Sequence, residues 1–395
     1  MLNYFRKTRH RNSDKCIYKD MFKKVLILSV SSGYGHIQAA HAIEQVFAEI
    51  RPDVHVQHLD ILGYSTTIFR AISSKIYIDM VNKSPRILNW LTNVCNRPWK
   101  NEELWAAFYR LNCLPLISKI KNYQPDLVVN THFVPARIIS SLKRKKVLHT
   151  PQVIIVTDFD VHSNWLCRPV DHYFVALKQT RMQMQQLGVL SEKITVSGIP
   201  IHPNFAQHKD KSLMRDKYNL KQDRTTVLIS SGGFGVGPME QLVTSLFHLK
   251  HKVQVIVICG KNERLKSRLE SLIAQQTYDE HVSFKVVGYT TDMDEYMAAA
   301  DILVGKAGGL TISEGLSRGL MMVIIGSLPV WEECNADILV KADAAIRCKD
   351  IPSLADQIDR LLDNPARQNL MLENARRLAR PRATYDIVEK LFAMT

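Results

Sequence analysis

A histidine follows a glycine-rich turn near the start of the chain. Gly33, Gly35 and His36 lie in the turn at residues 31–36, directly after an apolar run at residues 24–30. Glycines let the backbone approach a ligand closely, and a helix that begins there directs free N–H groups at it. A histidine in such a place can take a proton from a hydroxyl group near neutral pH. The pattern indicates a general base, and a histidine that only caps the turn is the alternative.

The same turn can be compared with a dinucleotide-binding fingerprint. Asp60 ends the second apolar run, where a ribose-binding acid belongs, but Gln38 occupies the third glycine position of G-x-G-x-x-G. A second glycine turn at residues 230–238 contains Gly232 and Gly233 and can hold a diphosphate or lie against a sugar. The missing glycine and the second nucleotide-type turn disfavour an NAD-dependent oxidoreductase.

A third glycine turn follows the short apolar run at residues 302–304. Gly308, Gly309 and Thr311 offer backbone N–H groups and a hydroxyl where a helix begins, which favours an anion. Glu314 stands one turn later, and a carboxylate there can accept both hydroxyls of a ribose. A phosphate site with a ribose acid beside it indicates a nucleotide.

Apolar, β-branched runs alternate with helical patterns along the chain and must position these turns. Strands are expected at residues 24–30, 54–60, 126–130, 153–158, 173–176, 226–230, 253–259, 283–287, 302–304 and 321–325. Such alternation indicates parallel sheets covered on both faces. A charge-rich segment at residues 205–224 divides two halves that begin alike, with a strand, a glycine turn and a helix. We predict an α/β protein with two Rossmann-like domains that face each other across a cleft.

The charge of the chain is unevenly distributed. The net charge is +14; residues 1–200 hold 27 Lys and Arg against 14 Asp and Glu, whereas residues 201–395 hold 25 against 24. A one-sided basic excess implies an anionic partner, either nucleic acid or an acidic membrane. No zinc finger or other nucleic-acid module is recognisable, so we expect a membrane and no nucleic acid. A basic face without a partner is the alternative.

The cysteines and the apolar segments indicate the compartment. The seven cysteines are scattered without a C-x-x-C pair, a pattern typical of reduced thiols in a cytosolic protein. Residues 1–24 are polar and basic and lack the apolar core of a signal peptide. The longest apolar-rich stretch, residues 320–331, is too short to span a bilayer. We expect a soluble or peripheral protein.

Residues 64–123 interrupt the alternation of strands and helices. Aromatic residues lie there beside basic ones: Trp90, Trp99, Trp105, Phe108 and Tyr109 with Lys75, Lys83, Arg86, Arg97, Lys100 and Arg110. This mixture suits contact with a membrane interface. The alternative is an amphipathic helix that buries its apolar stripe in the core. Because the basic excess lies in the same half, we predict membrane contact.

Several ordered motifs resemble those of a known family. Residues 308–314 read Gly-Gly-Leu-Thr-Ile-Ser-Glu, and Pro329-x-x-Glu-Glu-x-Asn335 follows. The first half adds Gly-Tyr-Gly-His at residues 33–36 and further motifs at 157–165, 170–176 and 197–201. Together they resemble the UDP-sugar-dependent glycosyltransferases of the B-type (GT-B) fold, above all bacterial diacylglycerol glucosyltransferases and plastid monogalactosyldiacylglycerol synthases.

The resemblance implies a role for each candidate residue. His36 is the base on the lipid hydroxyl, and Asp158 is the second catalytic candidate. The acceptor side comprises Gly33, Gly35, His162 and Trp165. The donor side comprises Gly232 and Gly233, Tyr289 beside the uracil, Gly308, Gly309 and Thr311 on the diphosphate, Glu314 on the ribose, and Glu332 and Glu333 on the sugar.

One residue departs from the family pattern, and two acidic triplets need an explanation. Family members usually have Pro-Gly-Gln-Glu where this chain has Trp331 before Glu332, which leaves the donor sugar open. The triplets at residues 158–160 and 292–294 read D-x-D, which binds metal in another glycosyltransferase fold. Because the expected fold differs, we interpret both triplets as coincidence. We expect no metal and no cofactor, with the UDP-sugar as a substrate.

The implied activity is an inverting transfer of a hexose from a UDP-sugar to diacylglycerol, with glucose favoured and galactose possible. Transfer of N-acetylglucosamine to a polyprenyl-linked lipid and a non-catalytic sensor of UDP-sugar are the alternatives. We expect a basic tail at residues 1–22, an acceptor and membrane domain at 23–205, a UDP-sugar domain at 222–365 and a helix at 366–395 that packs back on the first domain. The expected location is cytoplasmic, at the inner face of the cell membrane.

Overall fold

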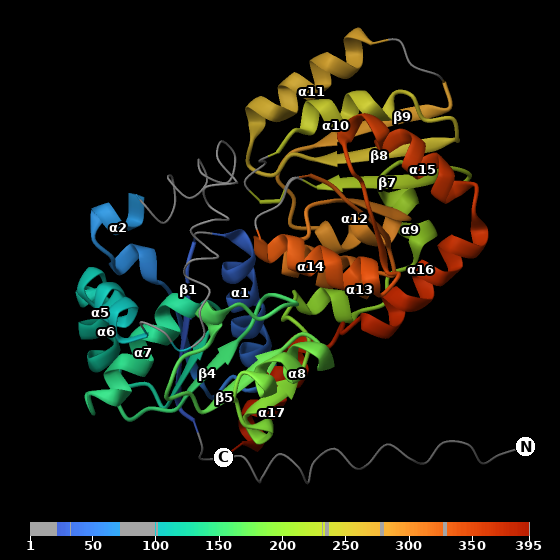
Figure 1. The fold of residues 1–395 in the computed structure, drawn as a ribbon. Coiled ribbons are helices and arrows are strands. Elements are labelled where there is room, and N and C mark those ends of the chain that lie inside the picture. Colours follow the sequence, from blue (N-terminus) through green and yellow to red (C-terminus); the bar gives the residue numbers. More distant parts are fainter. Residues whose placement is uncertain are drawn as a thin grey trace, which may run out of the picture.

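Two parallel β-sheets form the framework of the protein, one in each half of the chain (Figure 1). The computed structural model describes residues 22–31, 33–71, 99, 102–230, 232, 233, 237–276, 280–326 and 330–394. The predicted basic tail, apart from Phe22, and residues 72–98 of the predicted membrane-contact stretch lie outside the described residues.

The first sheet has six strands in the order β2-β1-β3-β4-β5-β6. The strands are β1 (Lys24–Ser29), β2 (His55–Asp60), β3 (Leu127–Asn130), β4 (Gln152–Ile155), β5 (His172–Val175) and β6 (Ile194–Val196). The chain leaves β1 in one direction to form β2 and returns to the other side of β1 to form β3. The strand order therefore reverses between β1 and β3, the place where ligands bind in open parallel sheets.

The second sheet also has six strands, in the order β12-β11-β10-β7-β8-β9. The strands are β7 (Thr225–Ser230), β8 (Val253–Ile258), β9 (Val282–Val287), β10 (Ile302–Gly305), β11 (Met321–Ile324) and β12 (Ala345–Arg347). The order reverses between β7 and β10, the two strands that precede the second and third glycine turns. Both glycine turns therefore lie at one switch point.

Helices cover both faces of the first sheet. They are α1 (Tyr34–Ile50), α2 (Thr67–Ala71), α5 (Glu102–Asn112), α6 (Leu114–Tyr123), α7 (Phe133–Arg144) and α8 (Lys178–Gln186). Short 3-10 helices are η2 (Ile61–Tyr64), η4 (Ser163–Trp165), η5 (Ser191–Lys193) and η6 (Pro203–Ala206). Alternate residues of β1 point to opposite faces, so Val25 and Ile27 pack towards α1, whereas Leu26 and Leu28 join the cluster with α6 and α7.

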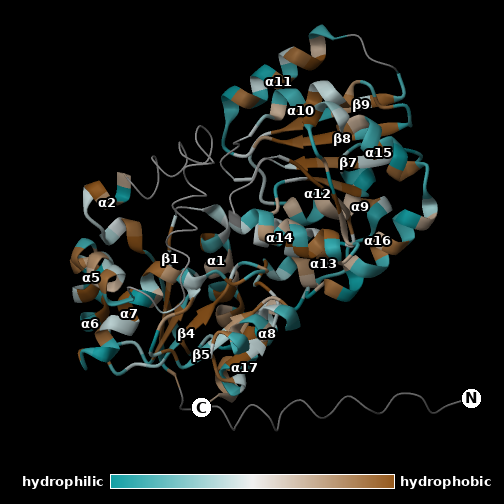
Figure 2. Cartoon of the chain, viewed as in Figure 1, coloured by the Kyte–Doolittle hydropathy of each residue, from teal (hydrophilic) through white to brown (hydrophobic). Residues whose placement is uncertain are grey.

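Helices cover the second sheet in the same way. They are α9 (Lys211–Lys217), α10 (Met239–Leu246), α11 (Glu263–Gln275), α12 (Met293–Ala299), α13 (Gly309–Ser317), α14 (Val330–Lys341), α15 (Leu354–Leu362) and α16 (Pro365–Leu378), with the 3-10 helix η7 (Ile351–Ser353); the last helix of the chain is α17 (Ala383–Ala393). Figure 2 shows the strands as apolar and the outer helices as largely polar. One apolar cluster joins Phe159 and Ile199 of the first half to Ile312 and Leu316 of α13. The two halves therefore share part of their core.

The last two helices belong to different halves. Helix α16 packs on α13 and α15, whereas α17 packs on α1 of the first sheet (Figure 1). The side chains of Ile387, Val388 and Leu391 are buried in the first-half core. The single returning helix predicted for residues 366–395 is therefore two helices, and only the second reaches the first half. The break lies at residues 379–382, where Pro381 prevents one continuous helix.

None of the described helices is long and apolar enough to cross a bilayer. The predicted α/β class with two parallel sheets is confirmed. Ten strands were predicted close to their observed positions, and β6 and β12 were missed. Each of these two edge strands has only three residues, which is too short to show a period in the sequence.

Candidate active site

The first switch point brings two segments of the first half together. The turn after β1 leads into α1, whose third residue is His36, and β3 ends one residue before Thr131. Thr131 Oγ1 donates a hydrogen bond to the backbone oxygen of His36 (2.9 Å). Neighbouring parallel strands end at the same edge of the sheet, so their following residues meet there.

The hydrogen bonds of His36 define its tautomer. Its Nδ1 lies 3.0 Å from the carbonyl oxygen of Thr131 and 2.9 Å from Thr157 Oγ1. A carbonyl oxygen can only accept, so Nδ1 carries the hydrogen and Nε2 carries the lone pair. Burial lowers the pKa of His36 to about 4, so the ring is neutral at pH 7.

A second histidine lies against His36 and was missed from the sequence. The ring of His132 meets that of His36 edge-on, with centroids 4.6 Å apart. His132 Nδ1 accepts a hydrogen bond from the backbone N–H of Val134 (3.1 Å) and so caps α7. Burial and the neighbouring histidines hold its pKa well below the usual range. Its place directly after β3, at the switch point, is the signal that could have found it.

Asp158 is buried beside the histidines, three residues beyond the end of β4. Trp165 Nε1 donates a hydrogen bond to Asp158 Oδ2 (3.0 Å), and His162 Nε2 lies 3.7 Å from the same oxygen. Burial raises the pKa of Asp158 to about 6, although its hydrogen bonds act in the opposite direction. Burial lowers the pKa of His162 to about 3, and the nearby Arg137 charge contributes. The structure thus brings together His36, Asp158, His162 and Trp165, as predicted.

Asn335 connects the two halves at this point. Its Oδ1 accepts a hydrogen bond from the backbone N–H of Phe159 (2.8 Å). Its Nδ2 lies 3.1 Å from the carbonyl oxygen of Ala307 and 3.5 Å from Asp158 Oδ1. The side chain is fully buried. It was recognised as part of a motif but was not predicted as a site residue, because its partners are remote in the sequence.

Helix α13 begins directly against the first half. A Cβ at Gly309 would lie 2.1 Å from the carbonyl oxygen of Thr157, so only glycine fits there. The space bordered by Gly305, Lys306 and Thr311 is about 10 Å³, barely enough for one water molecule. Gly309 therefore lies in direct contact with the first half.

Glu314 lies on α13, one turn beyond the glycines. Burial raises the pKa of its carboxyl to about 8, and the carboxylate of Asp294 contributes. Asp294 itself is paired with Lys209 (3.1 Å). Glu314 has no side-chain hydrogen bond within the described parts of the chain. A buried carboxyl without a partner is energetically costly, which makes Glu314 a candidate for binding a ligand.

Lys306, Glu332 and Glu333 lie around the second switch point. The aliphatic part of Lys306 passes the second glycine turn, since a Cβ at Gly237 would lie 3.8 Å from Lys306 Cε. Burial raises the pKa of Glu332 to about 7, and the Lys306 charge opposes that shift. Glu332 Oε2 is buried without a hydrogen-bond partner among the described residues. Glu333 forms an ion pair with Arg347 instead. Lys306 was not predicted as a site residue, although it lies within the third glycine motif.

The first and second glycine turns lie against each other. A Cβ at Gly233 would lie 2.6 Å from the Tyr34 ring, so Tyr34 rests on the backbone of the second turn. The hydroxyls of Tyr34 and Tyr289 lie 3.3 Å apart. Lys261 Nζ is 5.2 Å from the centre of the Tyr289 ring. Gly232 and Tyr289 are exposed beside this contact.

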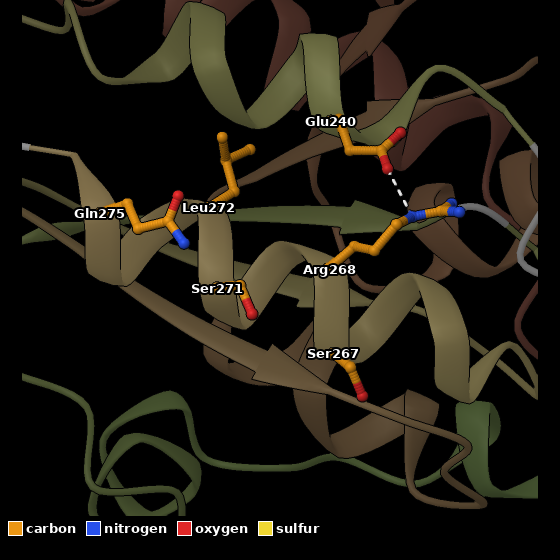
Figure 3. Close-up of a pocket in the computed structure, with 6 residues that line it drawn as sticks. All are labelled: Glu240, Ser267, Arg268, Ser271, Leu272 and Gln275. Atoms are coloured by element: carbon orange, nitrogen blue, oxygen red, sulfur yellow. Dashed lines mark ion pairs between the residues drawn. The ribbon is translucent and has the colours of Figure 1, made fainter.

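A surface hollow of about 440 Å³ lies away from all these residues, on the outer side of the second half. It is lined by Glu240 of α10 and by Ser267, Arg268, Ser271, Leu272 and Gln275 of α11 (Figure 3). Arg268 and Glu240 are ion-paired at its edge (2.7 Å). None of the predicted site residues borders it, and it lies outside the switch points.

Two family descriptions match consecutive parts of the chain. Monogalactosyldiacylglycerol (MGDG) synthase matches residues 36–201, and the glycosyltransferase family 28 C-terminal domain matches residues 226–390. The processive diacylglycerol beta-glucosyltransferase of Bacillus mycoides (strain KBAB4) is 30% identical over 94% of this chain and 93% of its own length. The protein of the same name from Bacillus cereus (strain 03BB102) matches equally.

Solved structures share the arrangement of the two sheets. MurG of Acinetobacter baumannii has a TM-score of 0.58 and 16% identity, covering 93% of this chain and 98% of that one. Anabaena Alr3699/HepE in complex with UDP-glucose has a TM-score of 0.54 and 16% identity, covering 94% and 98%. At these identities the likeness shows the fold, and the predicted GT-B fold is confirmed.

Proposed function

Because this chain belongs to the family of diacylglycerol glucosyltransferases, we propose that it transfers a hexose from a UDP-sugar to diacylglycerol. The observation that carries the mechanism is the neutral His36, whose Nδ1 is held by Thr131 and Thr157 while Nε2 keeps its lone pair. Glucose is the favoured sugar because the relatives that match over almost the whole chain are named glucosyltransferases.

The reaction is an inverting displacement. The diacylglycerol hydroxyl oxygen attacks the anomeric carbon from the face opposite UDP, and the bond from that carbon to the diphosphate oxygen breaks. His36 Nε2 takes the hydroxyl proton, which contributes roughly 100- to 10,000-fold to the rate. Asp158, which lies 3.7 Å from His162 Nε2, stabilises the positive charge that the transferred proton brings.

The donor lies on the second half in this proposal. Glu314 accepts hydrogen bonds from the ribose hydroxyls. The N–H groups of Gly308, Gly309 and Thr311 bind the diphosphate at the start of α13. Lys306 adds a positive charge beside the second glycine turn, where Gly232 and Gly233 lie. Tyr289, which remains exposed, borders the uracil. The unpaired Glu332 oxygen is available to a sugar hydroxyl, whereas Glu333 positions Arg347.

Turnover is expected to survive removal of divalent metals. In this proposal the N-terminus of α13 and Lys306 stabilise the negative charge of the leaving diphosphate, so no step requires a metal ion. Initial rates in excess EDTA are expected to equal those of the untreated enzyme. Complete loss of turnover in EDTA, restored by manganese, would instead make Asp158 and Asp160 metal ligands.

Membrane docking is proposed for an apolar face of α5. Leu104, Phe108 and Leu111 follow one another at helical spacing and are 68%, 43% and 63% exposed. Ile68 of α2 and Leu114 at the start of α6 are also exposed. Trp105 stacks on Tyr109 at the base of this face. With the basic excess of the same half, this face suits the inner, anionic surface of the cell membrane.

The double substitution of Leu104 and Leu111 by serine is expected to reduce liposome binding about tenfold or more, since two leucines lose burial in the lipid. Flotation with vesicles of increasing anionic lipid content measures the effect, and salt should weaken the binding of the unaltered protein. Serine at Leu213, which is exposed to the same 63% in the second half, is the matched control. Equal loss in both variants would count against a docking face on α5.

The sugar can be tested separately from the lipid. Initial rates with UDP-glucose, UDP-galactose and UDP-N-acetylglucosamine over the same diacylglycerol vesicles are expected to be highest for UDP-glucose. A preference for UDP-N-acetylglucosamine would favour the transferases of polyprenyl-linked lipids instead.

A further inference from the structure

Three side chains with metal-binding atoms meet on the first half, away from the proposed reaction centre. His41 and Glu44 lie on α1, and His58 lies on β2. One ligand atom from each lies within 4.8 Å of the other two. Within the described part of the chain, this is the one group of three His, Cys, Asp or Glu side chains so arranged.

The contacts within this group hold the three side chains close together. His41 Nδ1 is 3.2 Å from Glu44 Oε2, one turn along α1. The imidazole rings of His41 and His58 meet edge-on, with centroids 4.7 Å apart. His58 Nε2 is hydrogen-bonded to the buried Ser29 Oγ (2.7 Å), which fixes that ring from the side of β1. A histidine whose other nitrogen is held by the protein is typical of a metal ligand.

The local charge also favours a cation. The carboxylates of Glu44 and Asp60 both lie close enough to act on His58. Asp60 Oδ1 accepts hydrogen bonds from the N–H groups of Ser31 (3.1 Å) and Leu62 (3.2 Å), and these bonds hold the carboxylate near His58.

We infer that His41, Glu44 and His58 form a binding site for a zinc-type divalent cation. Two imidazoles and one carboxylate are a ligand set that Zn²⁺ accepts, and imidazole ligands disfavour Mg²⁺ and Ca²⁺. The side chains of His41 and Glu44 are 53% and 39% exposed, so a fourth position is open to water. Binding of the cation would draw the three ligand atoms, which lie within 4.8 Å of one another, into tetrahedral coordination.

The position of the site suggests a structural consequence. His41 lies five residues beyond His36 on the same helix, and His58 lies on the strand next to β1. A bound cation would join α1 to the end of β2 without touching the reacting atoms. The site is therefore independent of the proposed reaction and of its lack of a metal requirement.

Calorimetric titration of the metal-free protein with ZnCl₂ tests this inference. We expect one equivalent of bound zinc, and at least a tenfold weaker affinity in each of His41→Gln and His58→Gln. Ser29→Ala, which removes the hydrogen-bond partner of His58, is expected to weaken binding roughly tenfold. Zinc should raise the melting temperature of the unaltered protein and not that of His58→Gln.

A matched control is available in the second half. His251 contacts Asp359 (2.7 Å) and Asp363 (3.1 Å), so its ion-pair partners among the described residues are carboxylates. His251→Gln should keep the full zinc affinity. Undiminished binding in both His41→Gln and His58→Gln, or no saturable zinc binding by the unaltered protein, would overturn the site. Visible absorption of bound Co²⁺, present in the unaltered protein and lost in His58→Gln, supports it without reference to activity.

Discussion

Alanine in place of His36 is expected to lower the turnover number roughly 100-fold or more, because the acceptor hydroxyl loses its base. UDP affinity should be almost unchanged, since the proposed nucleotide site lies on α13 in the second half. The carbonyl oxygen of Thr131 and the hydroxyl of Thr157 lose their shared partner, so we expect a loss of a few degrees in melting temperature. Turnover and UDP titration of the same preparation measure both effects.

His55 provides the control for that variant. It is exposed on β2 and hydrogen-bonded to Tyr123, away from the proposed site. His55→Ala should retain normal turnover. A folded His36→Ala protein with near-normal turnover would remove this residue as the base, and Asp158, with its pKa raised to about 6, would take its place.

The pH dependence offers a second view of the same residue. Burial lowers the pKa of His36 to about 4, so its lone pair is available throughout the neutral range. We therefore expect that protonation of His36 does not lower kcat/KM between pH 8 and pH 6. His36→Ala should lack any acid limb that the unaltered enzyme shows near pH 4.

Glutamine in place of Glu314 is expected to weaken UDP binding about 10- to 100-fold. A carboxylate accepts two charge-assisted hydrogen bonds from the ribose, each worth about 1.5–3 kcal/mol, and the amide keeps one weaker acceptor. Calorimetric titration with UDP measures the loss. Glu240→Gln, at an exposed ion pair on α10, is the control and should bind UDP normally. Unchanged affinity in Glu314→Gln would contradict the ribose assignment.

The raised pKa of Glu314 adds a pH dependence with a defined sign. Its carboxyl titrates at about 8 in the folded protein because it is buried, whereas an unfolded glutamate titrates near 4.3. Because the Glu314 carboxyl stays protonated up to about pH 8 in the folded state but ionises earlier in the unfolded state, the free energy of unfolding falls as the pH rises from about 4.3 to 8. Glu314→Gln should therefore melt higher than the unaltered protein at pH 8 and equally at pH 4. UDP affinity of the unaltered protein should rise between pH 7 and pH 9, as the accepting carboxylate forms.

Much of this site could be predicted from the sequence, because glycine turns after apolar strands have a defined place in parallel sheets. His36 and Glu314 each follow such a turn, and Asp158 follows β4. The family resemblance is confirmed by relatives that match over almost the whole chain. The assigned roles of the site residues remain predictions, and the experiments above test them.

The remaining features depend on contacts between remote segments. His132 and Asn335 reach the site from the segment after β3 and from α14, and only the fold shows that they meet His36 and Asp158. Pro381 could have indicated the break between α16 and α17, but only the packing of α17 on α1 shows which helix returns to the first half. The exposed face of α5 became apparent only when the neighbours of Leu104 and Leu111 were known.

The most direct test of the proposed function is a product analysis. Purified protein is incubated with radiolabelled UDP-glucose and vesicles that contain both diacylglycerol and a polyprenyl-phosphate-linked lipid, and the extracted lipids are separated. We predict label in glucosyl-diacylglycerol with a β-linkage, the inverted configuration, and none in the polyprenyl-linked lipid. Two results would contradict the account. One is that neither UDP-glucose nor UDP-galactose gives a labelled diacylglycerol product, and the other is that label appears only in the polyprenyl-linked lipid.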